Sequence, residues 1–138
     1  MNRWQPDLTG VADPPPSTPG VFLAARFLLE CFGWIGFGVW GWHLGGGDIL
    51  GSILATVFVI ASAAVWGVFR ARHDPPGKTD QPVVVPGQVR LTIELVFFAL
   101  AAYGLWVGWN RAASETLMTA VVLLYGITWD RQRWLVRQ

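Results

Sequence analysis

Four long apolar stretches, separated by short polar or glycine-rich segments, most constrain how this chain can fold. They occupy approximately residues 21–43, 49–69, 90–109 and 113–129. A transmembrane helix needs about 20 consecutive, mostly apolar residues. These stretches also lack the polar face with which a helix of a soluble protein meets water. The sequence therefore predicts an all-α membrane protein with four transmembrane helices.

The overall composition agrees with this interpretation and excludes several classes of function. The chain of 138 residues is 53% hydrophobic and only 14% charged, whereas soluble domains carry about 25% charged residues. A net charge of +1 provides no basic field for binding nucleic acid. The single cysteine, Cys31, excludes an intrachain disulfide and a metal site built from several cysteines.

The remaining segments are expected to lie outside the helices. Residues 1–20 contain five prolines, and proline lacks the backbone donor that a helix needs, so we expect a disordered tail. Residues 70–89 are predicted to be an exposed loop, in which Val83–Val85 is extended but has no partner to pair with. Residues 131–138 are predicted to be a basic terminus, which leaves 21–130 as the transmembrane domain.

The distribution of basic residues predicts the orientation of the chain. Four spans place both termini and the 70–89 loop on one side of the membrane. That side carries nine of the ten Lys and Arg residues, and the other side carries only Arg111. Because cytoplasmic segments carry an excess of Lys and Arg, we expect both termini to lie in the cytoplasm.

The first and third predicted helices begin with the same charge pattern. An arginine precedes a glutamate by four residues at Arg26 and Glu30, and again at Arg90 and Glu94. A shift of 64 residues, from Arg26 to Arg90, aligns the two pairs and the two hairpins that contain them. A shift of two helices keeps the same direction across the membrane, so we predict two hairpins related by a parallel internal repeat.

The charged pairs allow two interpretations. A charged side chain costs about 2.5–3.5 kcal/mol at the centre of a bilayer, so two carboxylates at matching depths have a structural or a functional role. Residues four apart on a helix face each other, and each arginine can hold a glutamate in a local or crossed salt bridge that fixes helix register. Alternatively, Glu30 and Glu94 line a polar chamber that binds a proton or a cation, as in a small transporter.

The glutamate-bearing faces of the first and third helices are expected to pack directly against each other. Small residues at helix interfaces let backbones approach closely within a membrane. At equal depth, a large residue on one helix faces a small residue on the other at two places. The residues predicted at this interface are Gly33, Phe37, Phe97, Ala101, Gly104 and Gly108.

Tryptophan is unusually frequent and falls near the ends of the predicted helices. The chain contains nine Trp, and Trp is enriched at membrane–water interfaces because its ring is amphipathic. Six of them are predicted to be interface anchors: Trp40, Trp42, Trp66, Trp106, Trp109 and Trp129.

No combination of residues predicts an enzyme, a cofactor or a metal site. The two histidines, His43 and His73, would lie on opposite sides of the membrane, and neither has a cysteine or an acidic cluster at ligand spacing. We expect a non-enzymatic accessory or scaffold protein that acts through helix–helix association. The alternative is the small proton- or cation-linked transporter. The expected partners are the lipid bilayer and either a second copy of the chain or another membrane protein.

Several short segments resemble a known family. They are Arg26-Phe27-Leu28-Leu29-Glu30, Trp66-Gly67-Val68-Phe69, and Arg90 followed by Glu94-Leu95-Val96-Phe97. In this order they resemble the YrdB-like family of small four-helix bacterial membrane proteins, over about residues 22–130. The resemblance implies the four-helix fold and a place in the bacterial cytoplasmic (inner) membrane. It implies no activity, because none is established for that family.

Overall fold

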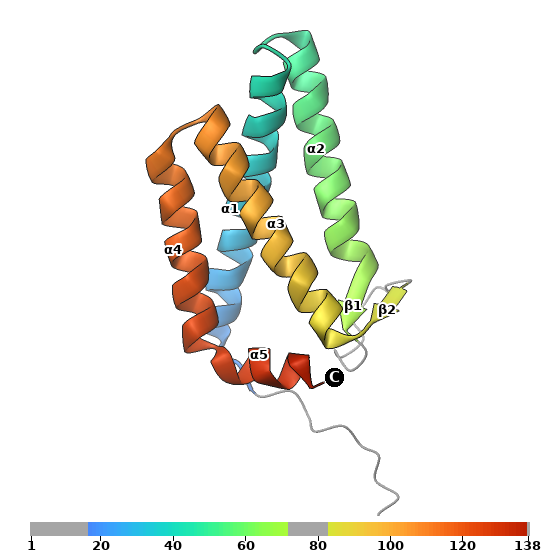
Figure 1. The fold of residues 1–138 in the computed structure, drawn as a ribbon, viewed down its shortest axis with the longest axis vertical. Coiled ribbons are helices and arrows are strands. Elements are labelled where there is room, and N and C mark those ends of the chain that lie inside the picture. The colour runs from blue at the N-terminus through green and yellow to red at the C-terminus, as the bar shows by residue number, and fades with distance from the viewer. Residues whose placement is uncertain (1–16, 72–82, 138) are drawn as a thin grey trace, which may run out of the picture.

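The computed structural model describes residues 17–71 and 83–137 (Figure 1). The predictions for the tail up to residue 16 and for the loop over 72–82 lie outside the described residues. Five helices and two short strands make up the described chain: α1 (Gly20–Leu44), α2 (Ile49–Val68), β1 (Phe69–Ala71), β2 (Val83–Val85), α3 (Gly87–Gly108), α4 (Arg111–Ile127) and α5 (Trp129–Val136).

The first hairpin, α1 and α2, turns at a run of glycines. Gly46 and Gly47 adopt positive φ angles of 77° and 78°, which glycine reaches without the strain that a Cβ imposes. Asp48 then caps α2, because its carboxylate accepts a hydrogen bond from the Leu50 amide at 2.9 Å. The chain therefore reverses direction within a few residues and lays α2 along α1 (Figure 1).

The second hairpin, α3 and α4, packs beside α1. Its turn is closed by Asn110, whose side chain accepts a hydrogen bond from the Ala113 amide at 2.8 Å. α1 is the central helix of the molecule, since it packs extensively against both α2 and α3 and also touches α4. α2 barely contacts α3, so α2 is covered by protein along one side only.

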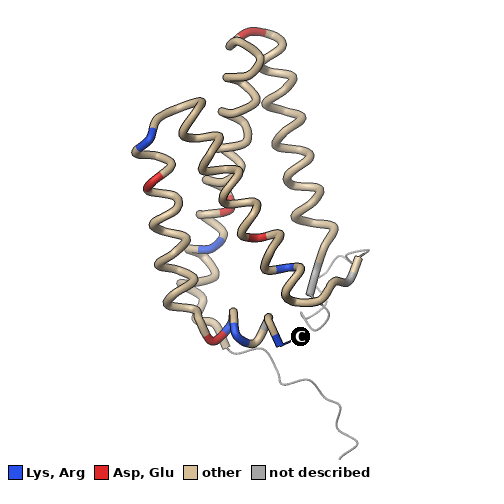
Figure 2. Tube along the Cα trace, in the orientation of Figure 1, with Lys and Arg blue, Asp and Glu red and all other residues tan. Residues whose placement is uncertain are grey.

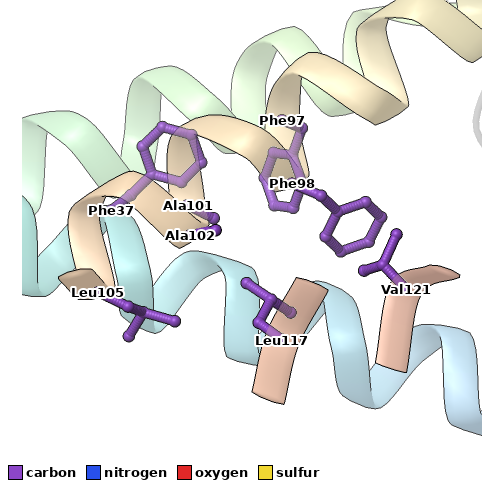
Figure 3. Packing of buried hydrophobic residues seen from close by; sticks show 8 residues of the cluster. All are labelled: Phe37, Phe97, Phe98, Ala101, Ala102, Leu105, Leu117 and Val121. Atoms are coloured by element: carbon purple, nitrogen blue, oxygen red, sulfur yellow. The ribbon is translucent and has the colours of Figure 1, made fainter. Parts of the chain in front are cut away.

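The hydrophobic core lies between α1, α3 and α4. Leu105 and Leu117 are fully buried there, and Phe98 is 1% exposed. α3 contributes most of the buried side chains, and α1 and α4 close over them. Figure 3 shows the cluster, which comprises Phe37, Phe97, Phe98, Ala101, Ala102, Leu105, Leu117 and Val121.

The segment between the two hairpins contains a pairing that the sequence analysis excluded. β1 pairs in parallel with β2, with Phe69 opposite Val83. The prediction that Val83–Val85 has no partner is therefore wrong. The partner comes from the end of the second apolar stretch, because Phe69 leaves the helical conformation with φ −99° and ψ 129°. α3 then begins at Gly87, three residues before the predicted start, directly after Pro86.

The fourth apolar stretch ends earlier than the sequence analysis expected. α4 ends at Ile127, and the Thr128 hydroxyl donates a hydrogen bond to the Leu124 carbonyl at 2.7 Å. The chain then turns, and α5 runs across the end of the bundle (Figure 1). A helix was not expected over 131–138. Because of this turn, the charged residues of α5 do not continue along the axis of the apolar helix α4.

Three of the described helices, α1, α2 and α3, are long and apolar enough to cross a membrane. α4 is shorter, with 17 residues. At 1.5 Å per residue it spans about 25 Å, compared with about 30 Å for the hydrocarbon core of a bilayer. The described chain therefore has three helices of spanning length and apolar composition, which is typical of a helical membrane protein.

Candidate functional site

Five polar side chains gather where α1, α3 and α4 meet, and we call them the charged cluster: Arg26, Glu30, Arg90, Glu94 and Tyr125. Figure 2 shows α1 and α3 each carrying one basic and one acidic position at this level, well away from the turn between α1 and α2. Both predicted arginine–glutamate pairs therefore belong to one site, to which α4 adds a tyrosine.

Glu94 is the centre of the charged cluster, and its side chain is only 1% exposed. Arg26 reaches across from α1 and forms an ion pair with Glu94 Oε1. Arg90, one turn earlier on α3, lies with its Nε 3.4 Å from the same oxygen. The Tyr125 hydroxyl donates to Oε2 at 2.7 Å. Both carboxylate oxygens thus have partners, as a buried charge requires.

Arg26 joins the two glutamates to each other. Its Nε lies 3.2 Å from Glu30 Oε1, one turn along α1, while its Nη2 faces Glu94. The side chains of Arg26 and Glu30 are 15% and 14% exposed. One guanidinium therefore makes the local salt bridge and the crossed one at the same time, which links α1 to α3 at a defined register.

Arg90 also holds the end of α2, through its Nη1 atom. Its Nη1 donates to the Trp66 carbonyl at 3.0 Å and to the Phe69 carbonyl at 2.8 Å. The last carbonyls of a helix have no partners within the helix, and a cation there is favoured by the helix dipole. The guanidinium carbon also lies 4.3 Å from the centroid of the Trp66 ring. Arg90 therefore connects α2 to α3 where these helices otherwise barely touch.

The small residues predicted on α1 and α3 lie at the contact between these helices. A Cβ added to Gly33 would lie 2.5 Å from Cε1 of Phe97. A Cβ on Gly104 would collide with the Gly36 carbonyl oxygen, and a Cβ on Gly108 would lie 2.7 Å from the Val39 carbonyl oxygen. Phe37 and Ala101 are both buried in the core shown in Figure 3.

The six predicted anchor tryptophans fall into two groups. Trp40 and Trp66 pack inside the bundle: the ring centroid of Trp40 is 5.1 Å from that of Phe58, and the ring centroid of Trp66 is 4.9 Å from that of Phe97. The other four are about half exposed: Trp42, Trp106, Trp109 and Trp129. Trp66 thus supports the charged cluster as well as the core.

An apolar groove with a volume of about 430 Å³ lies between α2 and α3, and residues of α1 form its base. Phe58 and Val65 line it from α2, and Val96 lines it from α3. Its two hydroxyl groups already have partners within their own helices, since Ser62 donates to the Val59 carbonyl and Thr92 to the Gln88 carbonyl. The groove therefore offers hydrocarbon contacts. Among the described residues, no three His, Cys, Asp or Glu side chains gather as ligands for a metal ion.

Tyr125 is the member of the charged cluster that the sequence analysis missed. It stands in an apolar stretch far along the chain from Glu94, and the only signal is a phenol within a predicted span. Its ring packs edge-on against Phe98, with 6.4 Å between centroids, and it faces the Arg26 guanidinium at 5.8 Å. The ring is held by packing, so the hydroxyl is aimed at Glu94.

Tyr125→Phe tests how much this hydroxyl contributes to stability. The variant keeps the ring contacts and removes one hydrogen bond to a buried carboxylate. Hydrogen bonds to charged groups contribute about 1.5–3 kcal/mol, so we expect the free energy of unfolding in detergent to fall by about that amount. Tyr103→Phe is the matched control, because Tyr103 is 46% exposed. Equal stability of both variants would contradict a role for the Tyr125 hydroxyl.

Comparison with known proteins places the chain in a family. Residues 24–124 match the family described as "Protein of unknown function (DUF2568)". The chain is also 34% identical to the "Uncharacterized protein YrdB" of Bacillus subtilis (strain 168) over 116 residues, which cover 84% of this chain and 94% of that relative. No solved structure matches it significantly. The family resemblance expected from the sequence is confirmed. The chain belongs to the YrdB-like family, whose description is that of a protein of unknown function (DUF2568).

Proposed function

We propose that this chain is a four-span protein of the bacterial cytoplasmic (inner) membrane that acts as a non-enzymatic accessory or scaffold through helix–helix association. A fourth crossing by α4 is supported by its outward apolar residues, since Val122, Leu123 and Ile127 are each at least 60% exposed. The excess of Lys and Arg on the side of the termini supports a cytoplasmic location for both. The matching charged pairs of α1 and α3 support the parallel repeat.

The observation that carries this proposal is that the buried carboxylate of Glu94 has protein partners at both of its oxygens. Glu94 is 1% exposed, and both of its oxygens are bound by protein groups. A carboxylate that carries a proton or a cation across a membrane must exchange its partners and reach water. A buried ion pair with complete partners instead fixes register and orientation. The cluster is therefore suited to hold α1, α3 and α4 together in a fixed register. We call this structural role the clamp.

α2 provides the surface for association. Its outward side carries Ile53, Val57 and Ile60, which are 54%, 50% and 63% exposed. The exposed residues Ala64 and Gly67 follow on the same helix, and small residues let a second helix approach closely in a membrane. The groove between α2 and α3 adjoins this side. We propose that a transmembrane helix of a second copy or of another membrane protein packs here.

Site-directed cross-linking tests the association. In a Cys31→Ala background, the single variants Ile53→Cys, Val57→Cys and Ile60→Cys are labelled in native membranes with a reagent that couples to the thiol and carries a photo-activated group, which reacts with any neighbouring protein. We expect adducts of defined mass at these three positions, which share one helix face, and none at Ala55→Cys, because Ala55 lies against Gly41 of α1. Val122→Cys on α4 is the exposed control. Equal adducts at Val122 would mean random collision, and their absence along α2 would contradict the proposal.

The transporter remains the second candidate because of Glu30. This carboxylate is 14% exposed and shares the Arg26 guanidinium with Glu94. A proton flux into vesicles that is lost in Glu30→Gln at a normal folded yield would support the transporter. We expect instead that Glu30→Gln lowers the folded yield more than it changes any flux, because it removes part of the clamp.

A further inference from the structure

The exposed face of α5 combines aromatic, aliphatic and basic side chains. Trp129, Arg133 and Val136 follow one another at intervals of four and three residues, so they lie close to one side of the helix, and Arg137 comes directly after its last residue. All four are exposed, Trp129 at 53% and Val136 at 43%. The Arg133 guanidinium lies 5.5 Å from the centroid of the Trp129 ring. This exposed face therefore places apolar and basic side chains next to one another.

The opposite side of α5 is attached to α3. Gln132 and Trp134 are 3% and 8% exposed, and Trp134 packs against Leu91 near the start of α3. The Gln88 side chain also donates to the Val136 carbonyl at 3.2 Å. The helix is thus held across the end of the bundle (Figure 1), and its exposed face has a defined direction.

The level of α5 along the bundle corresponds to a membrane interface. α1 has 25 residues and is about 37 Å long, compared with about 30 Å for the hydrocarbon core. Its first turn therefore reaches the headgroup layer. α5 begins at this level, because Phe22 of α1 lines a small depression together with Thr128 and Asp130. Tryptophan and arginine are both favoured in this layer.

We propose that α5 is an in-plane interfacial helix whose exposed face binds the headgroups of anionic phospholipids. Residues 129–137 carry three arginines and one aspartate, a charge that complements an anionic headgroup. Arg133 and Arg137 reach the phosphates, for which a guanidinium is a bidentate donor. Trp129 and Val136 enter the boundary between headgroups and acyl chains, as in other interfacial helices. This inference uses the membrane placement proposed above, but it does not depend on any partner of α2.

The test compares the association of two spin-labelled lipids with the protein reconstituted in phosphatidylcholine vesicles. We expect labelled phosphatidylglycerol to bind several-fold more strongly than labelled phosphatidylcholine. A basic residue near an anionic surface contributes about 1 kcal/mol, or about a factor of five, so the Arg133→Gln/Arg137→Gln variant should lose most of this selectivity. Screening at about 1 M salt should also reduce it. Arg111→Gln, at the opposite end of α4, should leave it unchanged.

Two outcomes would overturn the proposal. The first is unchanged selectivity in the double variant, or an equal loss in Arg111→Gln, which would place any anionic-lipid preference elsewhere. The second concerns depth, measured with a spin label at Val136→Cys in a Cys31→Ala background. Access to a polar relaxing agent as high as that of a fully aqueous position would mean that the face does not lie in the membrane interface. Cross-linking along α2 is measured separately, so failure of one proposal is distinguishable from failure of the other.

Discussion

Arg26→Gln is expected to destabilise the protein more than any other single change of a charged side chain. The substitution removes the arginine of α1 that pairs with Glu94, whose side chain is 1% exposed, while Arg90 and Tyr125 stay beside that carboxylate. Breaking a buried ion pair by removing one partner costs about 3–5 kcal/mol, because the buried charge that remains has lost compensation that water cannot replace. We therefore expect a large loss of folded yield and a fall of about that size in the free energy of unfolding.

The chain supplies a matched control for this prediction. Arg111 and Glu115 form another arginine–glutamate pair four residues apart, with 2.6 Å between Nε and Oε1, but their side chains are 81% and 60% exposed. Exposed pairs contribute about 0–1 kcal/mol, so Arg111→Gln should leave stability nearly unchanged. The measurement is unfolding in a mild detergent, followed by gel filtration.

A double-mutant cycle separates the ion pair from simple loss of packing. The Arg26→Gln/Glu94→Gln variant removes both charges of the crossed pair, so position 94 no longer carries a buried carboxylate, while the Arg26–Glu30 pair is lost in the single and the double variant alike. We expect it to be more stable than Arg26→Gln alone, with a favourable coupling between the two positions. A double variant that is no more stable than the single one would show that Arg26 acts through packing, and that the clamp is not electrostatic.

Gly36→Ala is expected to have the second largest effect, because it adds one methyl group where two helix backbones touch. The new Cβ would collide with the Ala101 carbonyl oxygen and lie 3.1 Å from the Ala101 Cα. Backbone atoms cannot rotate away as a flexible side chain can, so α1 and α3 must separate. Overpacking costs about 1–3 kcal/mol, and sometimes more, and we expect the upper part of that range.

The same substitution at Gly126 is the control for Gly36→Ala. Gly126 also lies within a helix, but a Cβ there would have nothing within 4 Å. Glycine within a helix is less favourable than alanine by about 0.5–1 kcal/mol, so Gly126→Ala should stabilise the protein slightly. Thermal unfolding of the two variants, measured side by side, should therefore shift in opposite directions. Shifts of the same sign would contradict the close contact between α1 and α3.

Features that depend on the local sequence were predictable. Long apolar stretches and a low content of charge predicted a helical membrane protein, because these are requirements of the lipid environment. Three short segments, taken in their order along the chain, predicted membership of the YrdB-like family, and this prediction is confirmed. Arg26 and Glu30 lie 3.2 Å apart, as a spacing of four residues in any helix allows. Each of these inferences needs only residues that are close together along the chain.

Only the tertiary structure decided which groups meet across helices. The contact of Arg26 with Glu94 depends on the rotation and register of α1 against α3, and that of Tyr125 with Glu94 on the position of α4. The parallel pairing of β1 with β2 joins residues on either side of a segment whose structure is not described. The direction of α5 depends on the docking of Trp134 near Leu91. Such contacts arise from packing between segments that are distant along the chain. Helical periodicity determines on which face of its helix a residue lies, but it does not determine which other segment packs against that face.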